Sequence, residues 1–220
     1  LYGVAVNFAA LTGKERVLDA YCGIGTIGMI ASRQAGEVVG IELNRDAVRD
    51  AIANAKRNGI QNCWFTQGDA GDFLHGMAKE RVPLDVVFLD PPRDGSDRKF
   101  LSSLLAMRPK RIVYISCGPE SLARDLQVLT DGGYTVKGVQ PVDMFPHTEH
   151  VETVVLLSRE TCPQTIQIKM EVDSGEITEQ PTYKRIQNYV EQKYGFKVHT
   201  AYIAEVKRMC GLEMHDAPNA

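Results

Sequence analysis

A glycine loop stands near the start of the chain, Asp19-Ala-Tyr-Cys-Gly-Ile-Gly-Thr-Ile-Gly28, directly after a short strand expected over residues 16–19. Its second half, Gly23-Ile-Gly-Thr-Ile-Gly28, fits the pattern GxGxxG, and Glu42 lies 19 residues after the first of these glycines. Glycines let the backbone approach a ligand closely, and a carboxylate after the second strand can accept hydrogen bonds from ribose hydroxyls. The loop therefore predicts a nucleotide-type cofactor, either a nicotinamide dinucleotide or S-adenosylmethionine.

Strands and helices alternate on both sides of this loop. Near-continuous apolar strands such as Val86-Val-Phe-Leu89 are typical of a parallel sheet that is covered by helices on both faces. The sequence predicts an α/β fold with seven strands, mostly parallel, with an antiparallel strand at one edge. The strands are expected over 16–19, 37–42, 63–67, 84–89, 111–116, 134–141 and 152–158. The helices are expected over 1–12, 26–34, 45–58, 71–79, 99–106 and 119–130.

Chemically useful side chains follow several of the expected strands. Glu42, Asp69, Asp90 and Cys117 each stand at or just after the carboxyl end of a strand. In open sheets of this kind, ligands bind at those ends, so one crevice is expected to hold all four side chains together with the glycine loop.

Cys117 directly follows the apolar strand expected over 111–116. The segment after it, Gly118-Pro119-Glu120, is typical of the first turn of a helix. A thiol at a helix N-terminus faces unpaired backbone N–H groups and the positive end of the helix dipole, and both favour the thiolate. The alternative interpretation is a small buried hydrophobic residue. The neighbouring segments favour a nucleophile.

The acidic residues help to choose the cofactor. An acid after the third strand, as in Gln67-Gly-Asp69, suits the adenine amino group, and Asp90-Pro-Pro92 stiffens a loop that faces the reaction centre. A dehydrogenase has no evident need for this set, so S-adenosylmethionine is favoured. Structural alternatives stay open: Glu42 as a helix-capping carboxylate, and Asp69 and Asp90 as turn-forming aspartates.

Composition sets further limits. The net charge of −3 gives no global attraction to nucleic acid, so any RNA contact must come from a local patch or another segment. No apolar stretch reaches the roughly 18 residues of a membrane helix, and no association with a membrane is expected. Five widely spaced cysteines without a CxxC pair argue against a structural zinc site and fit the reducing cytoplasm.

The pattern changes after Arg159. Residues 1–159 are expected to form the catalytic domain, 160–180 a linker or hairpin, and 181–220 a small appendage resembling a helix-turn-helix unit. A plain packing appendage with a solvated face is the alternative for this last region.

Four segments, in order, carry a family resemblance. They are Asp19-Ala-Tyr-Cys-Gly-Ile-Gly-Thr, Leu89-Asp-Pro-Pro-Arg-Asp-Gly95, Ile115-Ser-Cys-Gly-Pro-Glu120 and Asp143-Met-Phe-Pro-His-Thr-Glu-His-Val-Glu152. Together they resemble the catalytic domain of the uracil-C5 RNA methyltransferases, over about residues 1–159. The resemblance implies a Rossmann-like class I methyltransferase fold, S-adenosylmethionine as methyl donor, and a uridine of transfer RNA or, as the preferred target, of 23S ribosomal RNA.

The resemblance also implies roles for individual residues. Cys117 matches the family nucleophile and Glu152 its general base, while Asp90 and Arg93 are expected to meet the substrate. The residues expected at the cofactor are Tyr21, Gly23, Gly25, Thr26, Glu42, Asp69 and Asp90.

Parts of the family pattern are not found in this sequence. An upstream RNA-binding domain is expected in cis, and an iron–sulfur cluster is expected only in such an upstream segment. No metal is therefore expected here.

The chemistry needs one thiolate and one carboxylate. Thiolate addition at carbon 6 of uracil activates carbon 5 for methylation, and a base must then remove the proton from carbon 5. Glu149 is a rival to Glu152, but the two fall on different faces of an extended segment, and the family match favours Glu152. His147 and His150 lack further ligands at metal-binding spacing.

Three other functions remain open from the sequence: a cytosine-C5 RNA methyltransferase, a nicotinamide oxidoreductase, and an RNA-binding module without activity.

Overall fold

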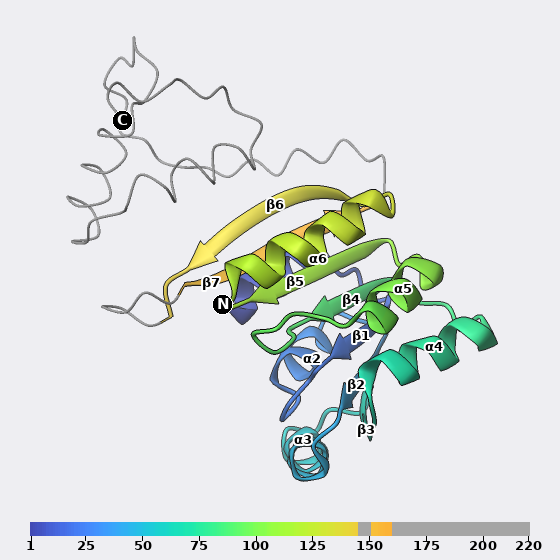
Figure 1. Ribbon diagram of the computed structural model, residues 1–220. Coiled ribbons are helices and arrows are strands. Elements are labelled where there is room, and N and C mark those ends of the chain that lie inside the picture. Colours follow the sequence, from blue (N-terminus) through green and yellow to red (C-terminus); the bar gives the residue numbers. More distant parts are fainter. Residues whose placement is uncertain (145–150, 160–220) are drawn as a thin grey trace, which may run out of the picture. The chain divides into compact units, whose positions relative to one another are not determined.

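The computed structural model describes residues 1–144 and 151–159, which form a seven-stranded sheet between two layers of helices (Figure 1). The expected linker, the expected appendage, and His147, Glu149 and His150 lie outside the described residues. The strands are β1 (Arg16–Ala20), β2 (Glu37–Glu42), β3 (Cys63–Gln67), β4 (Val86–Leu89), β5 (Arg111–Ser116), β6 (Thr135–Val142) and β7 (Glu152–Ser158). The helices are α1 (Tyr2–Ala9), α2 (Thr26–Ala31), α3 (Arg45–Arg57), α4 (Ala70–Glu80), α5 (Arg98–Met107) and α6 (Pro119–Asp131).

The strands lie in the order β3-β2-β1-β4-β5-β7-β6, and the first five in this order are parallel. Strand β7 is antiparallel to both β5 and β6. This confirms the expected α/β fold with a mostly parallel sheet and antiparallel pairing at one edge. The structure adds that the reversed strand is the second from that edge, between β5 and β6.

Helices α1, α2 and α3 cover one face of the sheet, and α4, α5 and α6 cover the other (Figure 1). Successive residues of a strand point to opposite faces. In β5, Val113 and Ile115 therefore belong to the core under α1, whereas Ile112 and Tyr114 belong to the core under α6.

Short polar side chains set where the helices begin. The Asn44 side chain caps α3, Asp69 caps α4 and Asp97 caps α5, each by accepting a hydrogen bond from a backbone N–H of the first turn. The expected starts at residues 71 and 99 are one residue late, because these capping positions went unrecognised.

Several expected ends were wrong by more than one residue. The helix expected over 1–12 ends at Ala9, because Ala10 is left-handed and the N–H of Thr12 donates to the Glu15 carboxylate at 2.8 Å. The helix expected over 26–34 ends at Ala31, and the strand expected from residue 84 begins at Val86. The remaining ends agree within one residue.

The ring of Phe65 in β3 fastens the glycine loop to the sheet. It lies against two glycines, Gly25 in the loop and Gly40 in β2, and occupies the space that a Cβ would need at either position. Gly25 also has a φ of 82°, which side chains rarely adopt. The glycine loop can therefore lie this close to the sheet because Gly25 and Gly40 have no side chain.

Gly40→Ala is expected to destabilise the protein by about 1–3 kcal/mol, since its methyl group would overlap the Phe65 ring and come within 2.9 Å of Cys22 Sγ. Chemical denaturation measures the change in unfolding free energy. Gly76→Ala is the matched control, because no atom lies within 4 Å of its added methyl group in α4. Replacing a glycine inside a helix by alanine raises the unfolding free energy by about 0.5–1 kcal/mol. Equal effects of the two substitutions would contradict the account.

Candidate active site

Four neighbouring strands of the sheet carry acidic or thiol side chains at the end of the sheet where the parallel strands have their carboxyl ends. Asp19 lies near the carboxyl end of β1, Asp90 directly follows β4, Cys117 directly follows β5, and Glu152 begins the reversed strand β7. Because β1, β4, β5 and β7 are neighbours and β7 runs in the opposite direction, these four residues lie at the same end of the sheet. That these side chains share one ligand crevice stays a prediction.

The register of β5 and β7 brings Cys117 and Glu152 to the same end of one ladder. Ile115 pairs with Val154, and Ser116 pairs with Thr153, which is the last pair of this ladder. Cys117 follows Ser116 in a bend, and Glu152 precedes Thr153 in β7. Both residues are partly buried, and Cys117 is a free thiol.

Alternation along β7 puts Glu152 on the α1 face. Val154 belongs to the core under α1, and Glu152 stands two residues before it in the same strand. Phe88 of β4 belongs to the same core, so Asp90 also points to this face.

Asp90 and Glu152 lie close enough to influence each other. Burial raises the pKa of Asp90 to about 6, and the charge of Glu152 contributes to the rise. Pro91, which directly follows, is buried, so the loop holds Asp90 in place after β4.

Asp19 is the functional candidate that the sequence analysis did not single out. Its side chain is fully buried, Oδ2 accepts a hydrogen bond from the Gly28 N–H at 2.8 Å, and Oδ1 has no hydrogen-bond partner in the described part of the chain. Burial raises its pKa to about 7, with smaller contributions from Asp90 and Glu42. The sequence did contain a signal for Asp19, because it is an acidic residue within an apolar strand that leads into a glycine loop.

Tyr2 is a second candidate without a sequence signal. It stands at the start of α1, and its pKa is raised by burial and further by Asp90, Asp19 and Glu152.

Glu42 holds the glycine loop to the end of β2. One oxygen accepts from the Gly23 N–H at 3.0 Å, and the other accepts from the Asn44 N–H at 2.8 Å. The cap of α3 itself is Asn44, so Glu42 is not the capping residue considered as the alternative. A carboxylate has about four acceptor sites, so two bonds leave Glu42 able to accept more.

Asp69 and Tyr21 each have a structural contact. Asp69 caps α4 by accepting from the Asp72 N–H at 2.8 Å, in line with the turn-forming alternative. Tyr21 has a left-handed φ of 61°, and its ring lies 5.5 Å from that of Phe100, on the α5 side of the sheet. Burial raises the pKa of Tyr21 to about 12. Thr26, the remaining expected loop residue, is the first residue of α2.

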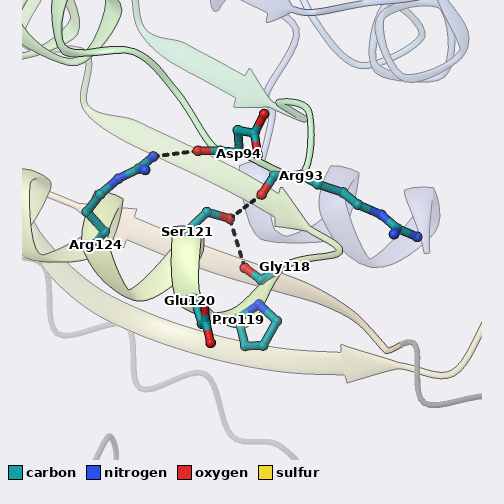
Figure 2. Close-up of a pocket in the computed structure, with 7 residues that line it drawn as sticks. All are labelled: Arg93, Asp94, Gly118, Pro119, Glu120, Ser121 and Arg124. Carbon is teal, nitrogen blue, oxygen red and sulfur yellow. Dashed lines mark hydrogen bonds between the residues drawn. The ribbon is translucent and has the colours of Figure 1, made fainter.

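A cavity of about 560 Å³ opens at the N-terminus of α6, next to the turn that follows Cys117. Figure 2 shows that the Arg93 guanidinium points away from α6, while the backbone oxygen of Arg93 accepts a hydrogen bond from Ser121 at 2.8 Å. Arg93 is therefore an exposed cation with a fixed backbone. The residues that line the cavity are Arg93, Asp94, Gly118, Pro119, Glu120, Ser121 and Arg124.

Over residues 1–144 and 151–159, no cluster of three metal-ligating side chains occurs. In the same residues, no helix has the length and apolar character to cross a membrane.

The family model for tRNA (uracil-5-)-methyltransferases matches residues 5–160. The chain belongs to this family. An uncharacterized RNA methyltransferase of Halalkalibacterium halodurans is 51% identical over 157 residues, which make up 71% of this chain and 34% of the relative. One from Listeria monocytogenes is 49% identical over 157 residues, 71% of this chain and 35% of the relative.

A solved structure agrees with the fold. The tRNA (uracil-54, C5)-methyltransferase of Pyrococcus abyssi, in complex with S-adenosyl-L-homocysteine, superposes with a TM-score of 0.59 at 32% identity. The match covers 70% of this chain and 37% of that one. The chain thus has the Rossmann-like fold of S-adenosylmethionine-dependent methyltransferases, and it spans about a third of the length of its curated relatives.

Asp19→Asn is expected to change how stability depends on pH. The pKa of Asp19 rises from 3.8 to about 7 on folding, so ionising this group opposes folding, and its contribution to stability is lost as pH rises from about 4 to 7. Asparagine carries no charge and escapes this loss. The unfolding free energy of Asp19→Asn relative to the unchanged protein should therefore rise by about 2–4 kcal/mol between pH 4 and pH 8. A constant difference across this range, measured by denaturant titration, would contradict the burial of an ionisable Asp19.

Proposed function

We propose that this chain is the catalytic part of an RNA methyltransferase that transfers a methyl group from S-adenosylmethionine to carbon 5 of uridine. The observation that carries the proposal is the register of β5 and β7, which brings a thiol and a carboxylate to the same end of one ladder, with the half-buried Asp90 near enough to that carboxylate to feel its charge. A nucleophile and a base at one end of the sheet match what this reaction needs. The family membership supports the same substrate class.

In the proposed reaction Cys117 is the nucleophile. Its thiolate forms a bond to carbon 6 of uracil, and the electron pair of the 5,6 double bond moves toward carbon 5 and the C4 carbonyl oxygen. S-adenosylmethionine, when bound, supplies the methyl group that carbon 5 takes up. Cys117 begins the turn between β5 and α6, which Ser116 closes by accepting from the Gly118 N–H at 3.1 Å. The thiol is therefore held on a fixed turn.

Glu152 acts as the base in the second half of the reaction. It removes the proton from carbon 5, the electron pair restores the 5,6 double bond, and the bond from carbon 6 to sulfur breaks to release the thiolate. Asp90, whose pKa of about 6 leaves it partly protonated near neutral pH, can donate a hydrogen bond to the uracil edge. Such a donor stabilises the charge that develops on the C4 oxygen.

The residues around the glycine loop fit S-adenosylmethionine. The loop offers backbone without a Cβ at Gly23 and Gly25, and Glu42 can accept from ribose hydroxyls. Ile24 in the loop and Leu43 directly after β2 are large apolar side chains with 50% and 69% of their surface exposed, which suits an adenine ring. The unpartnered Oδ1 of Asp19 suits a positively charged group. Asp69, Tyr21 and Thr26 remain proposed cofactor contacts.

RNA enters the proposal as the substrate, either ribosomal or transfer RNA. The target base must leave its stack to reach Cys117, and the exposed Arg93 is placed to contact a phosphate of the same strand. Because the chain covers about a third of its relatives' length, we propose that most phosphate contacts come from another part of the full-length protein.

The cytosine-C5 alternative finds no support in the loop after β4. Enzymes of that class usually carry a cysteine in this loop, and here it reads Asp90-Pro-Pro-Arg93. No observation favours this alternative over uridine.

Cys117→Ala is expected to abolish covalent trapping of RNA. The full-length protein, given S-adenosylmethionine and RNA that contains 5-fluorouridine, should form an adduct that survives denaturing gels, because fluorine at carbon 5 cannot be removed as a proton. The substitution should remove the adduct and lower methyl transfer by at least about a thousandfold.

Cys63→Ala is the matched control for this experiment. Burial raises the pKa of Cys63 to about 12, so it remains an unreactive thiol and its loss should leave the adduct intact. An adduct that persists in Cys117→Ala and disappears in another cysteine variant would refute the proposed nucleophile. Transfer to 5-fluorocytidine RNA but not to the uridine form would refute the proposed substrate.

A further inference from the structure

A second buried carboxylate, Asp125 in α6, lies on the opposite face of the sheet from the proposed reaction. Its side chain is fully buried and accepts four hydrogen bonds. Oδ2 accepts from the Ser96 N–H and from the Tyr114 hydroxyl, both at 2.7 Å. Oδ1 accepts from Arg124 Nε at 2.9 Å and Nη2 at 2.8 Å. One charge therefore joins β5, α6 and the loop that follows β4.

That loop, residues 90–97, is called the substrate loop below because it begins with Asp90 and contains Arg93. Helix α6 holds its backbone at successive residues (Figure 2). Ser121 Oγ donates to the Arg93 oxygen at 2.8 Å, and Arg124 Nη2 donates to the Asp94 oxygen at 2.7 Å. Asp125 accepts from the Ser96 N–H, as described above.

Gly95 completes this arrangement. It has a φ of 77°, and a Cβ on it would lie 2.5 Å from Arg124 Nη2 and 2.7 Å from Asp125 Oδ2. The backbone of the substrate loop thus approaches α6 as closely as a glycine permits.

Tyr114 extends the network into the strand that carries the thiol. It is fully buried in β5, three residues before Cys117, and its pKa is raised by burial and by the hydrogen bond to Asp125. The Ser96 hydroxyl is also buried and makes no hydrogen bond of ordinary geometry among the described residues. It nevertheless lies near enough to the Tyr21 and Tyr114 phenols to affect their pKa.

We propose that Asp125 is a positioning residue, which fixes the substrate loop against α6 so that Asp90 and Arg93 keep their place relative to Cys117. The inference rests on the proposed function, because it assigns that loop to the substrate. The charge of Asp125 strengthens its hydrogen bonds, and its burial keeps water from competing for them. A misplacement of about 1 Å between reacting groups can lower a rate about a hundredfold.

A role in folding alone makes a different prediction. Helix α6 and the residues of the substrate loop that it binds, Arg93 to Ser96, lie on the α4–α6 face, whereas Gly25 of the glycine loop packs on Phe65 in the core under α1. Loss of the Asp125 network should therefore slow the step with RNA and spare cofactor binding. A general loss of fold would weaken both in parallel.

The test uses Asp125→Asn and Gly95→Ala in the full-length protein. The first substitution leaves one acceptor oxygen and introduces an amide that repels the donors of Arg124, and the second adds a methyl group that pushes the loop from α6. Gly59→Ala is the matched control, since Gly59 has a similar φ of 65° and no atom within 4 Å of an added Cβ. Ser121→Ala removes the single bond to the Arg93 oxygen and serves if Asp125→Asn does not fold.

Three quantities are measured for each variant: the single-turnover rate of adduct formation with 5-fluorouridine RNA, the dissociation constant of S-adenosylhomocysteine, and amide hydrogen exchange over residues 93–97. Asp125→Asn and Gly95→Ala should form adduct about 10- to 100-fold more slowly, bind S-adenosylhomocysteine within about twofold of the unchanged protein, and exchange faster over the loop. Gly59→Ala should match the unchanged protein in all three.

Several results would overturn the inference. Adduct rates within about twofold of the unchanged protein in both folded variants would do so, and so would a parallel loss of cofactor affinity. If the unchanged protein forms no adduct at all, the proposed function fails instead. Hydrogen exchange then tests the role of Asp125 separately. An exchange rate over residues 93–97 that is the same in Asp125→Asn as in the unchanged protein would show that the network does not hold the loop.

Discussion

Strand β7 runs against the other strands and lies between β5 and β6, and the candidate site depends on this reversal. A parallel strand at the same position would present its carboxyl end beside Cys117, and Glu152, at the amino end, would lie at the far edge of the sheet. The antiparallel ladder, from Arg111–Ser158 to Ser116–Thr153, instead brings the first residue of β7 to the tip of β5. A thiol and a carboxylate that are far apart in sequence thus come to the same end of one ladder.

The end of the sheet that carries Cys117 also holds acidic side chains that the fold itself does not need. Asp19 and Asp90 are both raised in pKa, to about 7 and about 6, mainly by burial, which is a cost in stability at neutral pH. Perturbed carboxyls of this kind concentrate at functional sites. A ligand that brings positive charge, or hydrogen-bond donors, to the α1 face would offset this cost. On the other face Asp125 is also buried, but four hydrogen bonds satisfy it. The two faces thus differ in how their carboxylates are satisfied, and we propose ligand binding for the first and the holding of a loop for the second.

Most of the fold was accessible from the sequence, because apolar periodicity and the glycine loop specify alternating strands and helices. The strand bounds of β2, β3, β5 and β7 were predicted without error. Helix ends were harder, because Asp69 and Asp97 as caps and Ala10 as a left-handed stop depend on local backbone geometry. For the site, the sequence singled out residues at the strand ends but not the contacts between them. The bond from the Gly23 N–H to Glu42 and the missing partner of Asp19 Oδ1 depend on packing across strands, which no short motif encodes. The Asp125 network was missed for the same reason, since its members come from separate segments of the chain.

The central claim is that Glu152, at the same end of the ladder as Cys117, takes the proton from carbon 5. The most direct measurement follows the fate of an ordinary uridine RNA with Glu152→Gln in a single turnover, using mass spectrometry of the protein–RNA species, with Glu149→Gln as the matched control. Glutamine cannot accept the proton, so the account predicts that a covalent species carrying the new methyl group accumulates with Glu152→Gln, while Glu149→Gln releases 5-methyluridine normally. Normal release by Glu152→Gln, with accumulation in Glu149→Gln, would contradict it.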